Sequence, residues 1–322
     1  MSDRAVLEKL CHGPVTGVAL ARELGISRSA VHKRIEALRQ AGAEILVQPG
    51  LGYRLVHPLQ LLDREAIADV LGSDARGQLQ ALTVEYEIAS TQSAALSVPA
   101  PQQGCAVWLA ERQVAGQGRR GRVWASPLAA NLYLSLSRRF ERGFFALSGL
   151  SLVVGVVLAE ALRDLGFIQV GVKWPNDLMV EGKKLGGILV QLRGEANGPC
   201  EAVVGLGINA RMPAGYAAAI DQPWCDLSQL DGGKTISRNV LAAAVLDRLL
   251  PALARFELEG LTPFLPRWQT LDALAGRQVH VLDGQRVNQG VALGITETGA
   301  LRVRQSDGER IYHSGEVSLR AA

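Results

Sequence analysis

The stretch VGVKWPNDLMVEGKKLGGILVQL, residues 170–192, decides the fold. Its apolar runs predict three short strands, at Val170–Trp174, Leu178–Val180 and Gly187–Leu192. Lys173 and Asp177 stand four positions apart around Pro175, at the end of the first strand. Lys184 lies at the start of the third strand, just before two glycines. We therefore expect a sheet beside a pocket walled by bare glycine backbone, into which a lysine ammonium points.

Strand-like and helical segments alternate around this stretch, from about residue 63 to about residue 270. Further strands are expected at Cys105–Glu111, Asn131–Leu136 and Ala202–Ile208, and long helices at Ala146–Leu165 and Arg238–Gly260. This mixture predicts a sheet packed on helices, of α/β or α+β type, and leaves the order of the strands open.

The period of the sequence changes from about residue 271. Five short, mostly alternating runs follow, at Gln278–Leu282, Val287–Leu293, Leu301–Gln305, Arg310–His313 and Glu316–Leu319. Strong turn signals separate them, at Asp283-Gly284, Thr298-Gly299 and Asp307-Gly308. Five short strands in about 50 residues indicate a small β-barrel.

The first 62 residues form a separate basic segment. They hold eight Lys or Arg against five Asp or Glu, while the rest of the chain carries 26 of each sign. Apolar periodicity predicts helices at Val6–Cys11, Val18–Leu24 and Ser27–Gln40, followed by a hairpin of Glu44–Val47 and Tyr53–Val56. Two helices joined by a short turn at Gly25, with a hairpin wing behind them, form a winged helix-turn-helix pattern.

The polar face of the third helix is the candidate DNA-contacting surface. The residues expected to reach base edges and phosphates are Ser27, Arg28, Ser29, His32 and Lys33. An ordinary helical hairpin with a solvated basic face is the alternative, but the wing and the local excess of positive charge favour DNA binding.

The composition excludes several classes of protein. The chain has 322 residues, of which 48% are hydrophobic and 20% charged, so it is neither disordered nor collagen-like and is long enough for two or three domains. Its four cysteines lack C-x-x-C spacing, which supports neither a zinc site nor a disulfide framework and fits a reducing cytosol. The most apolar uncharged run, Phe144–Ala159, is shorter than the ~20 residues of a membrane span, so we expect a soluble, cytoplasmic protein.

A glycine-arginine segment, Gly116-Gln117-Gly118-Arg119-Arg120-Gly121-Arg122-Val123-Trp124, indicates small-anion binding. Its glycines let backbone N–H groups approach an anion, and its guanidinium groups pair with phosphate or carboxylate. Nucleic-acid contact or a plain solvated turn are the alternatives. A surface salt bridge is the alternative for Lys173 with Asp177, and a solvated hairpin is the alternative for Lys183 with Lys184. The segment Gly205–Asn209 offers a flat ligand a bare strand, or is simply a glycine-rich strand end.

These four segments, in this order, resemble those of the bacterial biotin–protein ligases, and the resemblance covers the whole chain. Its nearest form is the bifunctional biotin ligase and biotin-operon repressor. The implied fold is an α+β multidomain chain: an N-terminal winged helix-turn-helix (residues 1–62), a central mixed α/β sheet domain of the biotin/lipoate ligase type (63–270) and a small C-terminal SH3-like β-barrel (271–322).

The resemblance implies a two-step reaction. Biotin and ATP, with Mg²⁺ carried by the ATP and no metal held by the protein itself, form biotinyl-5′-AMP. The biotin is then transferred to a lysine of the biotin carboxyl carrier protein of acetyl-CoA carboxylase. The implied regulatory partners are biotin operator DNA and a second copy of the chain, in a homodimer formed when the adenylate is bound.

The same resemblance implies roles for individual residues. The catalytic set is Lys184, Arg119, Asp177 and Lys173. The biotin-binding set is Ser90, Thr91, Gln92, Gln113, Gly116, Gln117, Gly118, Arg119, Lys184, Gly187 and Leu189. The ATP or adenylate set is Arg119, Arg122, Trp124, Lys173, Asn209 and Trp224. Two positions depart from the family's common pattern, since Gln117 stands where arginine is frequent and Gln92 where asparagine is frequent.

Two other functions are weighed against a repressing ligase. A transcription factor that senses a nucleotide-like ligand without catalysis would not need Lys184, Asp177 and Arg119 together. A ligase with a vestigial DNA-binding module remains open, because phosphate-contacting residues alone do not specify an operator.

Overall fold

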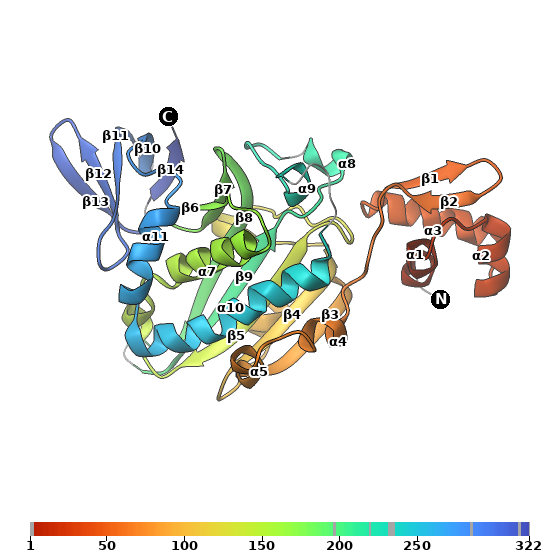
Figure 1. The fold of residues 1–322 in the computed structure, drawn as a ribbon, viewed down its shortest axis with the longest axis horizontal. Helices are drawn as coiled ribbons and strands as arrows, with labels where there is room; N and C mark the ends of the chain where they lie inside the picture. The colour runs from red at the N-terminus through yellow and green to blue at the C-terminus, as the bar shows by residue number, and fades with distance from the viewer. Residues whose placement is uncertain are drawn as a thin grey trace.

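Three structural units follow one another along the chain in the computed structural model, which describes residues 3–195, 198–218, 220–230, 236–283, 286–314 and 317–321 (Figure 1). The helical N-terminal unit lies at one end of the molecule, joined by an extended segment to the central sheet. The C-terminal strands lie at the other end (Figure 1). The predicted multidomain α+β fold is thereby confirmed.

The N-terminal unit is the predicted winged helix-turn-helix. It contains α1 (Asp3–Cys11), α2 (Gly17–Leu24), α3 (Arg28–Gln40), β1 (Ile45–Gln48) and β2 (Gly52–Leu55). The turn between α2 and α3 is set locally: Gly25 takes the left-handed conformation at φ +63°, and Ser27 Oγ accepts a hydrogen bond from the Ala30 N–H at 3.1 Å as the N-cap of α3. The apolar stripe of α3, Val31, Ile35 and Leu38, is fully buried against α1 and α2.

The central unit is built on a seven-stranded sheet of order β3-β4-β5-β9-β8-β7-β6, in which only the described pair β3–β4 is parallel. Its strands are β3 (Leu79–Ile88), β4 (Cys105–Gln113), β5 (Leu132–Phe140), β6 (Gly171–Lys173), β7 (Asp177–Val180), β8 (Lys183–Gly194) and β9 (Cys200–Ile208). Six of them coincide with the strands expected from sequence. The edge strand β3 is an addition: Leu82, Val84, Tyr86 and Ile88 alternate with Thr83, Glu85 and Glu87, a strand pattern that the sequence expectation did not use.

Long helices α7 (Leu150–Asp164) and α10 (Arg238–Glu259) pack side by side over one face of the sheet (Figure 1). The apolar run Phe144–Asp164 is long enough to cross a membrane by length and composition, but its most apolar window is 67% buried inside the protein, as befits a core helix. The shorter helices are α4 (Arg64–Ala68), α5 (Ser73–Gln78), α6 (Thr91–Ser97), η1 (Arg119–Gly121), η2 (Phe144–Leu147), α8 (Ala214–Ala217), α9 (Leu227–Leu230), η3 (Thr262–Phe264) and α11 (Leu265–Leu271).

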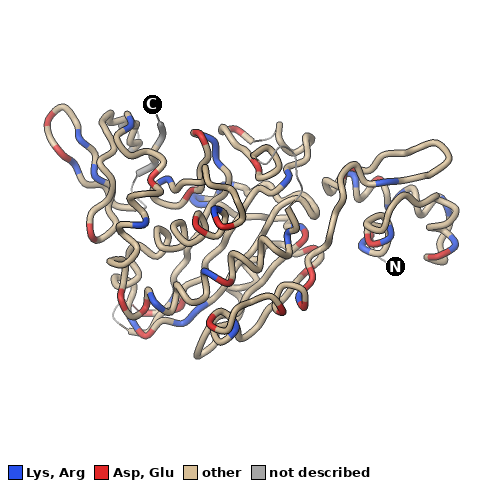
Figure 2. Tube along the Cα trace, viewed as in Figure 1, with Lys and Arg blue, Asp and Glu red and all other residues tan. Residues whose placement is uncertain are grey.

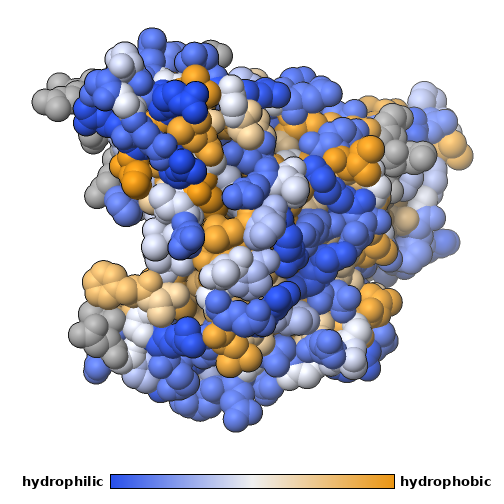
Figure 3. Space-filling view, turned by 60° about the vertical axis from the view of Figure 1, so that its left-hand side comes forward, coloured by the Kyte–Doolittle hydropathy of each residue, from blue (hydrophilic) through white to orange (hydrophobic). Residues whose placement is uncertain are grey.

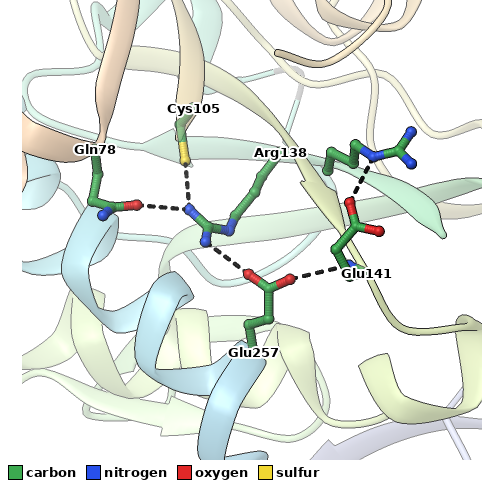
Figure 4. A network of polar contacts seen from close by, with 6 residues as sticks. Gln78, Cys105, Arg138, Glu141 and Glu257 are labelled. Atoms are coloured by element: carbon green, nitrogen blue, oxygen red, sulfur yellow. Dashed lines mark hydrogen bonds and ion pairs between the residues drawn. The ribbon is translucent and has the colours of Figure 1, made fainter. Parts of the chain in front are cut away.

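A buried polar network ties the end of α10 to the sheet (Figure 4). Arg138 of β5 donates through Nη2 to Glu257 at 2.8 Å and through Nη1 to Gln78 at 2.9 Å, beside the Cys105 thiol. Glu257 also accepts from the Glu141 backbone N–H at 3.0 Å. Because both charges are largely buried and paired, this cluster fixes α10 against the sheet far from the glycine-rich strand ends.

The C-terminal unit is a five-stranded antiparallel sheet of order β13-β12-β11-β10-β14. Its strands are β10 (Gln278–Asp283), β11 (Arg286–Ile295), β12 (Leu301–Gln305), β13 (Gly308–Tyr312) and β14 (Val317–Ala321). The last strand returns to pair with the first, which confirms the small β domain expected from the change of period.

Charge and hydropathy are mixed over the surface. Figure 2 shows Lys and Arg interspersed with Asp and Glu in all three units. On the face shown in Figure 3, hydrophobic residues form small separate groups within a mostly hydrophilic surface. Most hydrophobic residues are therefore buried in the cores.

Candidate functional site

Strand alternation places bare backbone on one face of the central sheet. In β9, Val204, Leu206 and Ile208 join the core, so Gly205 and Gly207 lie on the opposite face. Gly187 of β8 pairs with Gly207 and extends the strip sideways. We call Gly187, Gly205 and Gly207 the glycine floor; a cavity of about 60 Å³ lies on it.

Most of the predicted site residues meet at this cavity. Those that line it are Ser90, Thr91, Gln92, Gln113, Gln117, Gly118, Arg119, Trp124, Lys184, Gly187 and Leu189. The others lie around it without lining it, namely Gly116, Arg122, Lys173, Asp177, Asn209 and Trp224. Segments almost 120 residues apart in sequence therefore converge on one face of the sheet.

The hairpin of β7 and β8 brings the predicted catalytic charges together. Lys184 Nζ lies 2.8 Å from Asp177 Oδ1, and Lys173 Nζ lies 4.0 Å from Asp177 Oδ2. All three side chains are 16–17% exposed. Lys184 Nζ also lies 5.5 Å from the ring centroid of Trp124, a cation–π contact. One carboxylate is thus shared by two ammonium groups at the edge of the cavity.

The glycine-arginine segment folds back on itself above the floor. Trp124 N donates to Gly116 O at 2.9 Å, and Gly118 N donates to Arg122 O at 2.7 Å. Arg119 Nη1 donates to Asn176 Oδ1 at 2.6 Å, which turns the guanidinium toward the lysine-aspartate pair. Burial, followed by repulsion from Arg120, lowers the pKa of Arg119. A bound anion would offset both effects.

Hydroxyl and amide groups form a connected set at the α6 side of the cavity. Thr91 Oγ1 lies 2.8 Å from Ser135 Oγ and donates to Gln113 Oε1 at 3.1 Å. Gln113 Nε2 donates to Ser126 Oγ at 3.0 Å. Ser90 accepts from Ser93 N and caps α6. The set offers both donors and acceptors to a polar ring.

Three predicted residues act from the rim. Asn209 Nδ2 donates to Cys225 O at 3.1 Å, and Cys225 N donates to Lys184 O at 3.0 Å, so Asn209 holds the segment carrying Trp224 alongside Lys184. Gln117 is exposed and donates to Ser93 Oγ at 3.4 Å.

Sequence reasoning missed Asn176 and Ser135 as site residues, whereas the bare strand expected at Gly205–Asn209 lies in the cavity lining through Gly205 and Gly207. Asn176 lay within a quoted motif, so its signal was present but unused. Ser135 could not be singled out from sequence, because a serine within an apolar strand does not by itself indicate a binding site.

Metal donors are sparse in the part of the chain that the structure describes. No group of three or more His, Cys, Asp or Glu side chains there could hold a metal ion. Asp177, the acid beside the cavity, is already engaged with Lys184. This donor set suits a resident metal poorly.

The predicted DNA-contacting residues are all exposed on the N-terminal part of α3 or its cap: Ser27, Arg28, Ser29, His32 and Lys33. Ser27 Oγ is partly used in capping and lies 2.9 Å from Ser29 Oγ. The other side chains project from the face opposite the buried stripe of α3.

Comparison with known families finds three matches in chain order. Residues 4–54 match a family described as "HTH domain", residues 87–209 one described as "Biotin/lipoate A/B protein ligase family", and residues 275–320 one described as "Biotin protein ligase C terminal domain".

Individual proteins are similar over nearly the full length. The chain is 43% identical over 307 residues to the bifunctional ligase/repressor BirA of Salmonella typhimurium, covering 95% of this chain and 93% of that protein. The corresponding Escherichia coli protein is 42% identical over the same shares. Among solved structures, the biotin protein ligase from Aquifex aeolicus in complex with biotin and ATP superposes with a TM-score of 0.65 at 28% identity, over 76% of this chain and 100% of that one.

Proposed function

The chain belongs to the biotin protein ligase family, in its bifunctional ligase/repressor form, and from this premise we propose how its residues divide the work. The central unit joins biotin to ATP: a carboxylate oxygen of biotin attacks the α-phosphorus, and pyrophosphate leaves. A lysine amine of the biotin carboxyl carrier protein of acetyl-CoA carboxylase then attacks the acyl carbon of biotinyl-5′-AMP, and AMP leaves.

The observation that carries this proposal is the Lys184–Asp177 pair, 2.8 Å apart at the edge of the glycine floor. An ammonium held by one carboxylate can transfer to another at little cost in solvation. When the biotin carboxylate takes Lys184, Asp177 becomes available to orient the carrier lysine and accept its proton. The two steps therefore use the same pair in turn.

The remaining cations neutralise the phosphates. Arg119 faces the pair from above and stabilises the charge that develops on the α-phosphate. Lys173 and the exposed Arg122 lie farther out, where they meet the outgoing pyrophosphate. Mg²⁺ supplies further charge neutralisation on the phosphates when ATP brings it. Ser90, Thr91, Gln92 and Gln113 hold the ureido ring, and Trp124, Asn209 and Trp224 surround the adenylate.

Mass spectrometry of an apo carrier domain mixed with biotin, Mg-ATP and the protein tests the ligase. A biotin-sized increment on one lysine is the expected result. Lys184→Ala should slow both adenylation and transfer by about 10²–10³-fold, the usual loss of one electrostatic stabiliser. Lys183→Ala, which removes the exposed neighbouring ammonium, is the matched control and should leave both rates near wild type. Full rescue of Lys184→Ala by pre-formed biotinyl-AMP would confine Lys184 to the first step.

The N-terminal unit makes the same protein a repressor of biotin-synthesis genes in the cytoplasm. One short recognition helix binds DNA weakly, whereas two on a two-fold operator bind specifically, so the homodimer that forms with adenylate is the repressing species. Operator affinity at fixed salt should rise when biotin and ATP are added. Arg28→Ala should weaken it, and Arg64→Ala, an exposed arginine on the ligase unit, should not. Equal affinity with and without adenylate would leave an uncoupled DNA module.

A further inference from the structure

Two side chains lie directly on the glycine floor, one at each end. A Cβ built on Gly207 would come within 2.3 Å of the Trp124 indole, and one on Gly205 within 2.5 Å of Gln92 Oε1. Because Gly205 and Gly207 share a face of β9, Trp124 and Gln92 are neighbours over the same strip. Both line the cavity.

Gln92 is held firmly. Its Nε2 donates to Gln191 Oε1 at 2.8 Å and to Val203 O at 3.3 Å, and its Oε1 accepts from Ser135 Oγ at 3.2 Å. The side chain is only 3% exposed. Moving the amide would leave several buried polar groups unpaired at once, which is costly.

Trp124 is held weakly by comparison. Its indole Nε1 is buried and finds no hydrogen-bond partner among the described residues, and the residue as a whole is half-buried. Moving the indole gives up the cation–π contact with Lys184, breaks no hydrogen bond and exposes a donor that water can satisfy.

The space between the two is too small for a ring system. The cavity measures about 60 Å³, whereas pockets for small organic ligands usually measure about 300–1,000 Å³. When a bicyclic ligand enters, Trp124 moves at a lower cost in hydrogen bonds than Gln92 does. Gln92 stays.

We propose that the Gln92 carboxamide, positioned by Gln191, is the fixed wall that sets the size of the ring system this ligase activates. The inference rests on the proposed function, in which the ureido end of biotin lies beside Thr91, Gln92 and Gln113. The wall admits a bicyclic urea with unsubstituted ureido nitrogens and excludes one enlarged at that end. The asparagine common at this position in the family is one methylene shorter and would set the wall farther back.

Pyrophosphate release measured separately with biotin and with a ureido-N-methyl biotin tests the wall, and the ratio of the two kcat/KM values gives the preference. Wild type should prefer biotin by about 10–200-fold, the usual discrimination for one methyl group in a closed pocket. Gln92→Ala should reduce that preference by about tenfold or more. Gln92→Asn and Gln191→Ala should reduce it by smaller factors, since each leaves part of the wall in place. Gln103→Ala, the same change on an exposed loop, should leave the preference unaltered.

Each outcome separates this inference from the proposed function. If wild type does not activate biotin, the proposed function fails. If biotin is activated normally and the preference is the same in every variant, the wall alone is refuted. An equal loss for both substrates in Gln92→Ala also refutes it, because Gln92 would then be a binding contact without a role in size selection. Should Gln92→Ala fail to fold, the preference measured for Gln191→Ala decides.

Discussion

The two terminal units are attached to the ligase unit in opposite ways. The N-terminal unit has a hydrophobic core of its own, to which the described part of the ligase unit contributes only Leu128 and Ala129 as buried members. The C-terminal unit has no such separation, because Val279, Val281 and Val303 belong to the same continuous core as the ligase helices. A unit with a separate core can be removed without unfolding its neighbour, whereas a unit that shares a core cannot.

Polar contacts carry the N-terminal junction. Leu128 N donates to Ala41 O at 2.7 Å, and Tyr216 Oη donates to Gln40 O at 3.1 Å, both at the end of α3. Behind them Glu111 is buried, pairs with Arg238 at 2.6 Å and accepts from the linker N–H of Leu62. Directional contacts of this kind set an orientation while burying little apolar surface.

At the C-terminal junction a hairpin turn contacts the segment that carries Lys173. Trp174, next to Lys173, is 2% exposed, and its Nε1 donates to Gly299 O at 3.0 Å. Ser148 Oγ donates to Thr298 O at 3.3 Å beside it. The C-terminal unit therefore helps to hold the segment next to the ligase site in position.

Deleting each terminal unit in turn should give the largest difference between the two junctions. Deleting residues 1–60, which spares Leu62 of the ligase core, should abolish operator binding and leave carrier biotinylation measurable. Deleting residues 271–322 removes several buried Val, Ile and Leu side chains at about 1.5–3 kcal/mol each. That loss rivals the whole stability of about 5–15 kcal/mol of a folded protein. Circular dichroism melts and ligation assays measure both; a folded, active protein lacking 271–322 would contradict the shared core.

The contrast between the junctions also shows which features of the fold can be predicted from the sequence. Local signals predicted the wing, the Gly25 turn and the five C-terminal strands, since each depends on residues close in sequence. The junctions depend on contacts such as Trp174 with Gly299, which lie 125 positions apart, so neither tryptophan nor glycine signalled the other. The edge strand β3 was missed although its apolar and polar residues alternate, so a local signal was present there and was not used.

The site shows the same division. The glycine and charge motifs, together with the family resemblance that they carry, predicted most of the residues around the cavity. Their pairing did not follow from sequence: Arg119 with Asn176 and Gln92 with Gln191 join different strands and loops. Residue type reveals which side chains carry chemistry, whereas only the register of the sheet reveals which of them meet.

Gly299→Ala should sharpen the comparison at the C-terminal junction. Gly299 has φ +83°, and an added Cβ would lie 2.8 Å from Leu152 Cδ1 and 3.1 Å from Leu261 Cδ2. Gly276, at φ +71° with open space around it, is the matched control. Both alanines meet left-handed strain of about 1–2 kcal/mol, and Gly299→Ala adds overpacking of about 1–3 kcal/mol. Urea unfolding should therefore place Gly299→Ala clearly below Gly276→Ala; equal losses would mean that the junction is loosely packed.

The smallest expected effect is a pH dependence at the same junction. Asp272 follows α11, where Ala273 N donates to Val172 O and ties the ligase sheet to the C-terminal unit. Burial raises the pKa of Asp272 to about 6, against a partly opposing hydrogen bond from Leu274 N at 2.9 Å. The folded protein thus holds this proton at pH values where the unfolded chain, with a pKa of 3.8, has lost it. Stability from this group is present below about pH 4 and falls as pH rises through 6.

Asp272→Asn removes that titration and keeps an oxygen to accept from Leu274 N. The variant should match wild type near pH 4 and exceed it above pH 7 by about 1–2 kcal/mol, after allowance for partial solvent screening. Urea unfolding at several pH values measures the difference, with Asp74→Asn on an exposed helix as the control for the same chemical change. The comparison of junctions predicts that the gain disappears in a protein lacking residues 271–322 and persists in one lacking residues 1–60. If the gain in stability instead disappeared in the protein lacking residues 1–60, the assignment of Asp272 to the C-terminal junction would be contradicted.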